Sequence, residues 1–284
     1  MPPAPVKIGK FKASRIVVKE SWAVLKQDKE IMLFPIISSI FTTIIFLILA
    51  AVFYFLIIGG NLESLDSATG NVIFYVGLLI YYLIIFFIIN FFQAGLFIIV
   101  QARFTGGNLS FKDGINGAKK FAGKIFIWSL INATVGVVLR VIADKAKIVG
   151  QIISAVLGAA WQILTYFSLP SLIIGNTTIK GSFKESAAII RKTWGETLIV
   201  NFGVGLFFGL MIMAVFVIGL IIVILIPSIY VAIPIGVIIV AGIIILSIIS
   251  TTLGSIFKLA LYNYAKNGVV PQAFSPEIVK GAIK

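Results

Sequence analysis

The sequence predicts an all-α integral membrane protein with six transmembrane helices, built as three repeats of a basic amphipathic segment followed by a helical hairpin. Its composition is 60% hydrophobic and 12% charged, with a mean hydropathy of +1.13, whereas a soluble domain carries about 45–50% apolar and about 25% charged residues. The apolar residues lie in long uncharged runs, and the cations gather between alternate runs. We therefore expect a single membrane domain over residues 1–284, in which residues 265–284 form a short cytoplasmic tail.

The first two runs predict a helical hairpin. Residues 32–58 contain no charged residue, and at about 1.5 Å per residue they reach about 40 Å, enough to cross a hydrocarbon core of about 30 Å. Pro35 falls in the first turn, where its missing amide donor costs little. Residues 61–71 are polar and acidic, which predicts a solvated turn before the second run, residues 72–101.

The remaining runs predict two further hairpins. Helices three to six are expected at about residues 125–139, 148–174, 197–226 and 233–261. A charged turn containing residues 140–147 separates helices three and four, and Pro227 and Pro234 are expected to close the last hairpin. Arg103, Arg140 and Lys258 lie near predicted helix ends, from which long side chains can reach the lipid headgroups.

The distribution of Lys and Arg predicts the orientation, because short loops rich in these residues stay in the cytoplasm. Of the 23 cations, 20 lie in residues 1–31, 101–124, 175–197 and 258–284. The other three lie in residues 140–147, on the opposite side. We expect both termini in the cytoplasm. The alternative is that helices three and four form a half-hairpin that does not cross the membrane.

An internal repeat supports the division into three units. The sequence Ser-Phe-Lys-acidic begins at Ser110 and again at Ser182, 72 residues later, and a shorter copy begins at Phe11. Each copy precedes two apolar runs. The predicted repeat units cover about residues 8–101, 108–176 and 180–264.

The segment that begins each unit is amphipathic at helical spacing, with aromatic residues beside a row of cations. This pattern is suited to the headgroup plane of a membrane. The alternative is a cytoplasmic helix packed on the bundle with solvated cations. The predicted lipid-interface residues are Phe11, Lys12, Lys19, Trp22, Lys26, Phe111, Lys112, Lys119, Phe183, Lys184, Arg191 and Trp194.

The available chemistry is limited, since the sequence contains no histidine and no cysteine. Imidazole and thiolate are the usual groups for metal binding, nucleophilic attack and proton transfer near neutral pH. We predict no catalytic residue, no cofactor and no metal site, so an enzyme is a weak hypothesis. The cations are explained by topology and anionic lipid, and we expect no nucleic-acid partner.

Neutral polar residues remain inside the predicted helices. They are expected either to hydrogen bond between helices or to line a polar cavity, and Pro170 frees one backbone carbonyl for another partner. The candidates are Asn90, Gln93, Asn132, Gln162, Tyr166 and Asn201.

Three stretches resemble a known family. They begin at Ser21, Tyr166 and Ala260 and read Ser-Trp-Ala-Val-Leu-Lys-Gln-Asp-Lys-Glu, Tyr-Phe-Ser-Leu-Pro and Ala-Leu-Tyr-Asn-Tyr-Ala-Lys-Asn-Gly. These stretches resemble an uncharacterised family of prokaryotic multi-pass membrane proteins. More remotely, the Ser-Phe-Lys-Glu segment at Ser182 and the Trp-Gly pair at Trp194 resemble the membrane domain beside some glycerophosphodiester phosphodiesterases. The resemblance implies a location in a prokaryotic cytoplasmic membrane. It implies a fold and not an activity.

Two functions follow as hypotheses. The first is a multi-pass protein that interacts with anionic lipid or organises the membrane, without catalysis. The second is a small-solute or lipid transporter with a neutral polar pathway. No substrate or protein partner can be read from the sequence.

Cysteine labelling can test the orientation, because the chain has no native cysteine. Ser67→Cys and Ser228→Cys should react with a membrane-impermeant thiol reagent outside intact cells, and Ser182→Cys should not. Labelling at position 182 would reverse the orientation. If Lys145→Cys does not react with the reagent from outside, the half-hairpin alternative is favoured.

Overall fold

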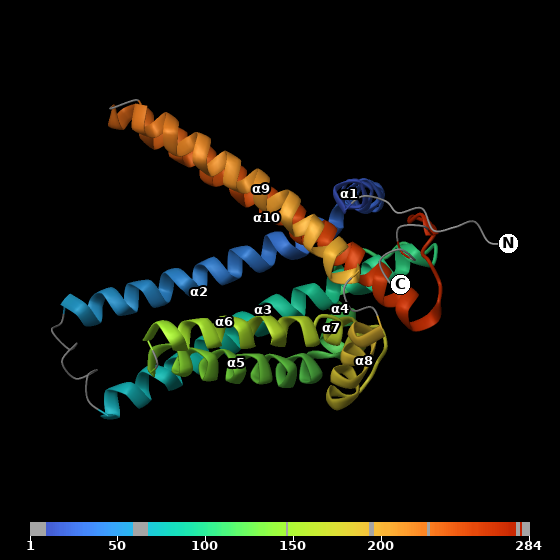
Figure 1. The fold of residues 1–284 in the computed structure, drawn as a ribbon, viewed down its shortest axis with the longest axis horizontal. Helices are drawn as coiled ribbons and strands as arrows, with labels where there is room; N and C mark the ends of the chain where they lie inside the picture. The colour runs from blue at the N-terminus through green and yellow to red at the C-terminus, as the bar shows by residue number, and fades with distance from the viewer. Residues whose placement is uncertain are drawn as a thin grey trace. The chain divides into compact units, whose positions relative to one another are not determined.

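A computed structural model describes residues 10–58, 68–145, 147–192, 196–225, 228–276 and 279. The described residues are largely helical, and none of them forms a strand (Figure 1). Among them, six helical segments are long and apolar enough to cross a membrane. The prediction of an all-α chain with six apolar membrane spans is therefore confirmed.

The helices follow one another in an order of short and long elements. They are α1 (Lys10–Gln27), the 3-10 helix η1 (Lys29–Met32), α2 (Leu33–Ile58), α3 (Ala68–Phe104), α4 (Phe111–Lys120), α5 (Ala122–Lys145), α6 (Lys147–Leu164), α7 (Ser168–Ile173), α8 (Ile179–Lys192), α9 (Glu196–Leu225) and α10 (Ile229–Asn267).

The chain forms two compact units. Unit 1 comprises Met1–Leu33, Val100–Asn108 and Ile189–Lys284. In it α9 and α10 lie side by side, and α1 packs against both (Figure 1). Unit 2 comprises Phe34–Ile99 and Leu109–Ala188. In it α5 and α6 form the second hairpin.

Burial within each unit is concentrated at one end of the long helices. We call this the basic end of the unit, because it carries α1 in unit 1 and α4 with most of α8 in unit 2. In unit 1, Phe257 and Tyr262 near the end of α10 are fully buried, whereas Leu225 at the other end of the hairpin is 74% exposed. In unit 2, Phe97 of α3 is fully buried, whereas Phe55 of α2 is 70% exposed. The exposed apolar arms are suited to lipid contact, and the packed core lies toward the basic end.

Two helices are longer than a bilayer requires. Helix α3 has 37 residues and α10 has 39, so at about 1.5 Å per residue they reach about 56 and 58 Å against a hydrocarbon core of about 30 Å. Neither helix can lie wholly within hydrocarbon. Their C-terminal parts, which are buried in protein, extend beyond the exposed apolar arms.

The predicted boundary of helix three is wrong by about six residues. Helix α5 continues to Lys145, so Arg140 and Asp144 lie inside it and not in a turn. Arg140 Nε donates to Asp144 Oδ2 at 3.0 Å, one helical turn away. Tyr75 Oη of α3 also donates to Asp144, at 3.4 Å. Pairing of the charges and a cation in the last turn both favour the longer helix.

Helix four is predicted as one rod, but the structure divides it into α6 and α7 around a turn at residues 165–167. At this break, Phe167 N and Leu164 O do not make the backbone hydrogen bonds of a continuous helix. Ser186 of α8 satisfies both, since its Oγ accepts from Phe167 N at 3.0 Å and donates to Leu164 O at 2.6 Å. Pro170 then lies in the first turn of α7, where its missing amide hydrogen has no helical partner to lose.

Pro234 does not close the last hairpin. Helix α10 begins at Ile229 and contains Pro234 in its second turn, while Pro227 lies outside the described residues. The proline removes one helical hydrogen bond. In a helix of 39 residues this single loss near the N-terminal end does not stop the helix.

Helix α4 packs closely against the backbone of α3 within unit 2. A Cβ on Gly114 would lie 3.0 Å from the carbonyl oxygen of Gly95 in α3 and 2.6 Å from Phe34 Cζ. The ring of Phe111 lies 4.6 Å from the ring of Phe34, centroid to centroid. Only a residue without a side chain allows this approach.

Gly114→Ala should therefore destabilise the protein by about 1–3 kcal/mol, because the added methyl group overpacks a closed contact. Thermal unfolding of the purified protein in detergent measures the loss. Gly77→Ala on α3 is the control, since nothing lies within 4 Å of its Cβ position. Equal losses in the two variants would contradict the close contact.

Candidate functional site

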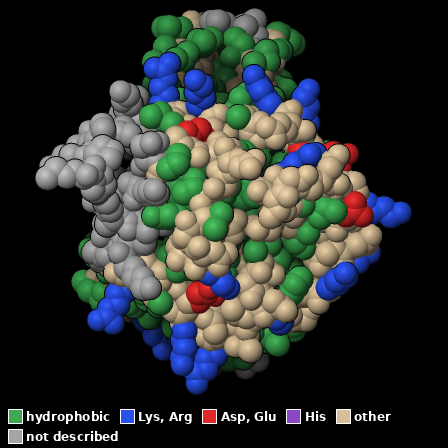
Figure 2. All heavy atoms as spheres, turned by 90° about the vertical axis from the view of Figure 1, so that its right-hand side faces the viewer, with side chains coloured by type: hydrophobic (Ala, Val, Ile, Leu, Met, Phe, Trp, Pro, Cys, Tyr) green, Lys and Arg blue, Asp and Glu red, His purple; other side chains and the backbone are tan. Residues whose placement is uncertain are grey.

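One face of helix α1, which we call the basic stripe, carries cations and points away from the rest of unit 1. Arg15, Lys19, Trp22 and Lys26 are all exposed, at the spacing of one helical face. The opposite face, which includes Val17 (0% exposed), is buried where α1 packs against α9 and α10. The face drawn in Figure 2 carries Lys and Arg side chains together with fewer Asp and Glu side chains.

Helices α4 and α8 also present cations outward. In α4, Lys112 and Lys119 are exposed, while Ala118 is buried. In α8 the exposed cations share one face, and buried serines share the other. The exposed cations of α8 are Lys180, Lys184 and Arg191, and its buried serines are Ser182 and Ser186. Because Ser182 is fully buried, Lys184→Cys is a better labelling position for this helix.

The aromatic residues predicted for the interface divide into two groups. Trp22 is 38% exposed. Phe111 packs on Phe34, and Phe183 lies 4.9 Å from the ring of Trp128 and 5.5 Å from that of Trp161. The side chains of Phe11 and Lys12, and the whole of Trp194, lie outside the described residues. Phe111 and Phe183, which were predicted to contact lipid, therefore pack against aromatic rings of the protein.

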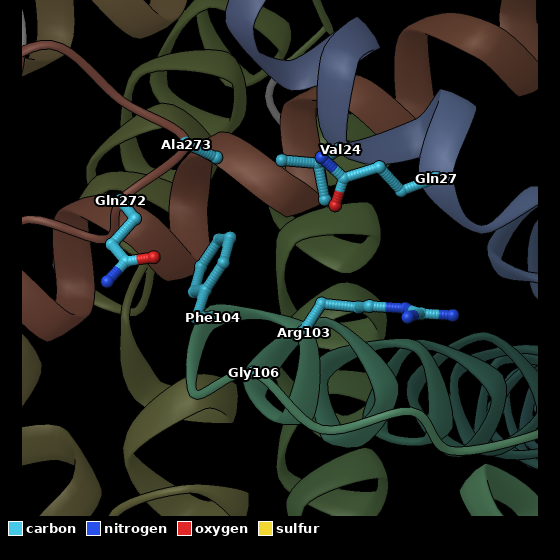
Figure 3. Close-up of a pocket in the computed structure, with 7 residues that line it drawn as sticks. All are labelled: Val24, Gln27, Arg103, Phe104, Gly106, Gln272 and Ala273. Atoms are coloured by element: carbon cyan, nitrogen blue, oxygen red, sulfur yellow. The ribbon is translucent and has the colours of Figure 1, made fainter.

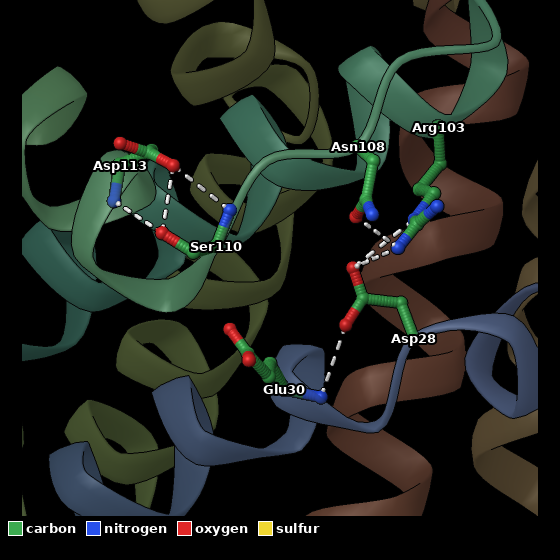
Figure 4. Close-up of polar contacts among 6 residues, drawn as sticks. All are labelled: Asp28, Glu30, Arg103, Asn108, Ser110 and Asp113. Carbon is green, nitrogen blue, oxygen red and sulfur yellow. Dashed lines mark hydrogen bonds and ion pairs between the residues drawn. The ribbon is translucent and has the colours of Figure 1, made fainter.

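A capping box begins α4. Ser110 Oγ accepts from Asp113 N at 3.3 Å, and Ser110 N donates to Asp113 Oδ2 at 3.0 Å (Figure 4). The hydrogen bonds donated by the Ser110 side chain and backbone hold the pKa of Asp113 below its ordinary value. The carboxylate is the form that completes the capping box.

An ion pair fixes the end of α3 in unit 1, where sequence reasoning had expected Arg103 to reach the headgroups. Asp28 Oδ2 accepts from Arg103 Nε and Nη2, both at 3.1 Å, with side-chain exposures of 5% for Asp28 and 20% for Arg103 (Figure 4). Asp28 Oδ1 accepts from Glu30 N at 3.1 Å and so caps η1. Arg103 also donates to Asn108. The nearly buried pair ties the segment after α1 to the end of α3.

The predicted polar residues make contacts between helices of unit 2. Asn90 of α3 donates to Ser129 of α5 at 3.1 Å. Asn132 of α5 accepts from Trp161 of α6 at 3.0 Å. Both contacts join neighbouring helices.

The other polar candidates differ in their surroundings. Gln162 is exposed, and Tyr166 packs its ring edge against Phe167. Gln93 is partly buried on α3, and the side chain of Asn201 lies outside the described part.

A cavity of about 280 Å³ opens in unit 1 beside Arg103 (Figure 3). Sequence reasoning missed it, because its walls come from three distant segments. They are Val24 and Gln27 of α1, Arg103, Phe104 and Gly106 at the end of α3, and Gln272 and Ala273 after α10. None of its described lining residues is acidic, and nowhere in the described part of the chain do three acidic side chains lie together as metal ligands would.

The segment after α10 is held in place on unit 1. Gly268, with a φ of 69°, ends α10 by donating its amide to Tyr264 O at 2.8 Å. Phe274 then packs against Phe104 and Phe257. Ser275 donates from its backbone and its hydroxyl to Glu20 of α1. The cavity wall formed by residues 272 and 273 is therefore fixed.

Residues 72–271 match the family of unknown function DUF6159. The chain belongs to this family. The match begins in α3 and ends at Pro271, so it includes the end of α3 with Arg103 and all the later helices. No curated protein and no solved structure matches the chain. Membership in DUF6159 brings no activity, and the prokaryotic origin and the phosphodiesterase likeness stay predictions.

A double-mutant cycle tests the Asp28–Arg103 pair. Asp28→Asn and Arg103→Gln should each destabilise the protein by about 3–5 kcal/mol, since each leaves a nearly buried charge without its partner. The double variant should lose much less than the sum, with a coupling of about 1–3 kcal/mol in the free energy of unfolding.

The control pair is Arg140 and Asp144, with side-chain exposures of 53% and 34%. An exposed pair on one helix should couple by only about 0.3–0.5 kcal/mol. Coupling of the same size in both cycles would show that burial adds nothing to the first pair.

Proposed function

We propose that this protein is a six-span membrane protein whose basic end binds the anionic headgroups of one leaflet and so anchors or organises lipid there, without catalysis. The observation that carries the proposal is the outward stripe of α1, in which Arg15, Lys19, Trp22 and Lys26 share one exposed face. Cations beside an interfacial aromatic residue are typical of a helix that lies on a charged membrane surface.

The exposed cations of α4 and α8 support the same reading. Each of the three basic helices turns buried residues toward protein and cations outward. Each also precedes a pair of long helices in the chain, with the short α7 following the second pair. This order supports the proposed three-unit repeat. The proposed orientation, with both termini in the cytoplasm of a prokaryotic cell, places these faces against the anionic inner leaflet.

The transporter remains the alternative, and the polar residues within the apolar helices are its motivation. The hydrogen bonds of Asn90 to Ser129 and of Asn132 to Trp161 instead favour helix packing, which is the common use of such residues. Lipid contact at the basic end is therefore the function that the described geometry supports best.

A fluorophore on Ala23→Cys would report lipid contact by the stripe, because position 23 is exposed and the chain has no other cysteine. In reconstituted full-length protein at low salt, nitroxide-labelled phosphatidylglycerol should quench it more strongly than nitroxide-labelled phosphatidylcholine. Each lysine contributes about 1 kcal/mol near an anionic surface. The Lys19→Gln/Lys26→Gln variant should therefore lose most of the preference, and high salt should remove it from the wild type.

The matched control removes two cations elsewhere, with Arg140→Gln and Lys145→Gln at the far end of α5. This variant should keep the preference. Equal quenching by the two lipids in the wild-type protein at low salt would rule out anionic headgroup contact by α1.

A further inference from the structure

The cavity beside Arg103 lies where α3 ends. The candidate span of α3 stops at Phe104. Gly106, with a φ of 81°, adopts the left-handed conformation that ends the helix. Nothing lies within 4 Å of the Cβ position of Gly106, so the missing side chain leaves this wall open. The cavity is therefore at the boundary between an apolar helix and its polar connection.

The polar lining combines a guanidinium that is already held with two exposed amides. Arg103 is held by Asp28 and Asn108 through Nε and Nη2, and none of these bonds uses Nη1. Gln27 and Gln272 add two primary amides from α1 and from the segment after α10 (Figure 3). A guanidinium that is held before binding loses little entropy when it binds a ligand.

The end of α3 does not oppose an anion as an uncapped helix C-terminus would. Ala102 O accepts from Thr105 N and from Gly107 N, and Arg103 O accepts from Gly106 N. Thr105 Oγ1 donates to Gln101 O. The carbonyl groups of residues 101–103 therefore accept hydrogen bonds from the turn that follows the helix.

The described lining of the cavity favours an anion, because its one charged side chain is the cation of Arg103. Asp28, which balances Arg103, is not among the described lining residues. Around this pair, the exposed Lys26 and Lys29 are offset by Glu30 and by Glu20, which accepts from Ser275. Phe104, Val24 and Ala273 supply an apolar wall beside the donors. This combination suits a phosphate ester joined to a small group that has both polar and apolar atoms.

We propose that this cavity binds an anionic phosphate ester, with the phosphate at Arg103 and Gln27 and the glycerol part beside Phe104 and Gln272. The ester can come from a lipid headgroup or from a soluble glycerol phosphate. The inference adds a stoichiometric site to the proposed surface contact and does not depend on it.

The test measures the melting temperature of the full-length protein in neutral detergent. The probes are dihexanoyl phosphatidylglycerol, sn-glycerol 3-phosphate and dihexanoyl phosphatidylcholine. Phosphatidylglycerol should raise the melting temperature with saturation, because a ligand that binds the folded state stabilises it. Tighter binding of phosphatidylglycerol than of glycerol phosphate identifies a lipid, and equal binding identifies a soluble ester.

Gln27→Glu/Gln272→Glu should weaken the affinity for phosphatidylglycerol about tenfold or more, by placing one carboxylate at the phosphate and one beside the glycerol part. Both positions are exposed, so the variant should fold like the wild type. The control, Asn116→Asp/Asn267→Asp, changes two exposed amides outside the cavity and should bind normally.

Three results would overturn the site. They are the absence of a saturable shift with any probe, equal shifts with phosphatidylcholine and phosphatidylglycerol, and full retention of binding in the Gln27→Glu/Gln272→Glu variant. Because this experiment contains no membrane surface, a negative result does not contradict the proposed contact between the α1 stripe and anionic headgroups. Failure of the stripe in the quenching experiment likewise leaves this cavity untouched.

Discussion

Hydrocarbon offers no hydrogen-bond partner to a peptide group, so a chain that crosses a bilayer must satisfy its backbone within the protein. Continuous helices do this for most of the chain, and the places where helices stop need another solution. Between α6 and α7, one hydroxyl on Ser186 serves both the freed amide of Phe167 and the freed carbonyl of Leu164. At the end of α3, the turn around Gly106 serves the last carbonyl groups. These helices are thus interrupted at positions where other protein groups form hydrogen bonds with the freed backbone groups.

The same constraint explains where the charges are. Asp28 and Arg103 are nearly buried, but each lies in reach of the other and of further polar groups, so neither charge is left unbalanced. Cations without such a partner, such as Lys19 and Lys26, point outward from the helix that carries them. The exposed apolar arms of α2, α9 and α10 carry no ion pair among their described residues. The described ion pairs thus lie toward helix ends, and the exposed cations of the short helices face outward.

The two Ser-Phe-Lys segments, in α4 and α8, are alike in sequence but differ in local structure. Ser110 lies before α4 and caps it, whereas the matching Ser182 lies inside α8 and is buried. The cause is local, since Thr178 Oγ1 accepts from Gly181 N and α8 begins earlier relative to the Ser-Phe-Lys motif. Phe111 and Phe183 then reach different partners, Phe34 for the first and Trp128 with Trp161 for the second.

The sequence by itself determined the membrane class, the helical content, the number of apolar spans and which segments carry the cations. These properties depend on hydropathy and length, which are local and additive along the chain. The ends of helices were less predictable, because Arg140 and Asp144 stabilise α5 only as a pair, and Ser186 reaches the break before α7 from another helix. Only the tertiary structure decided that Arg103 pairs with Asp28 and that Gln27 and Gln272 line one cavity. Gln27 and Gln272 are far apart in the chain and belong to no motif, so only the packing of α1 and the segment after α10 brings them together.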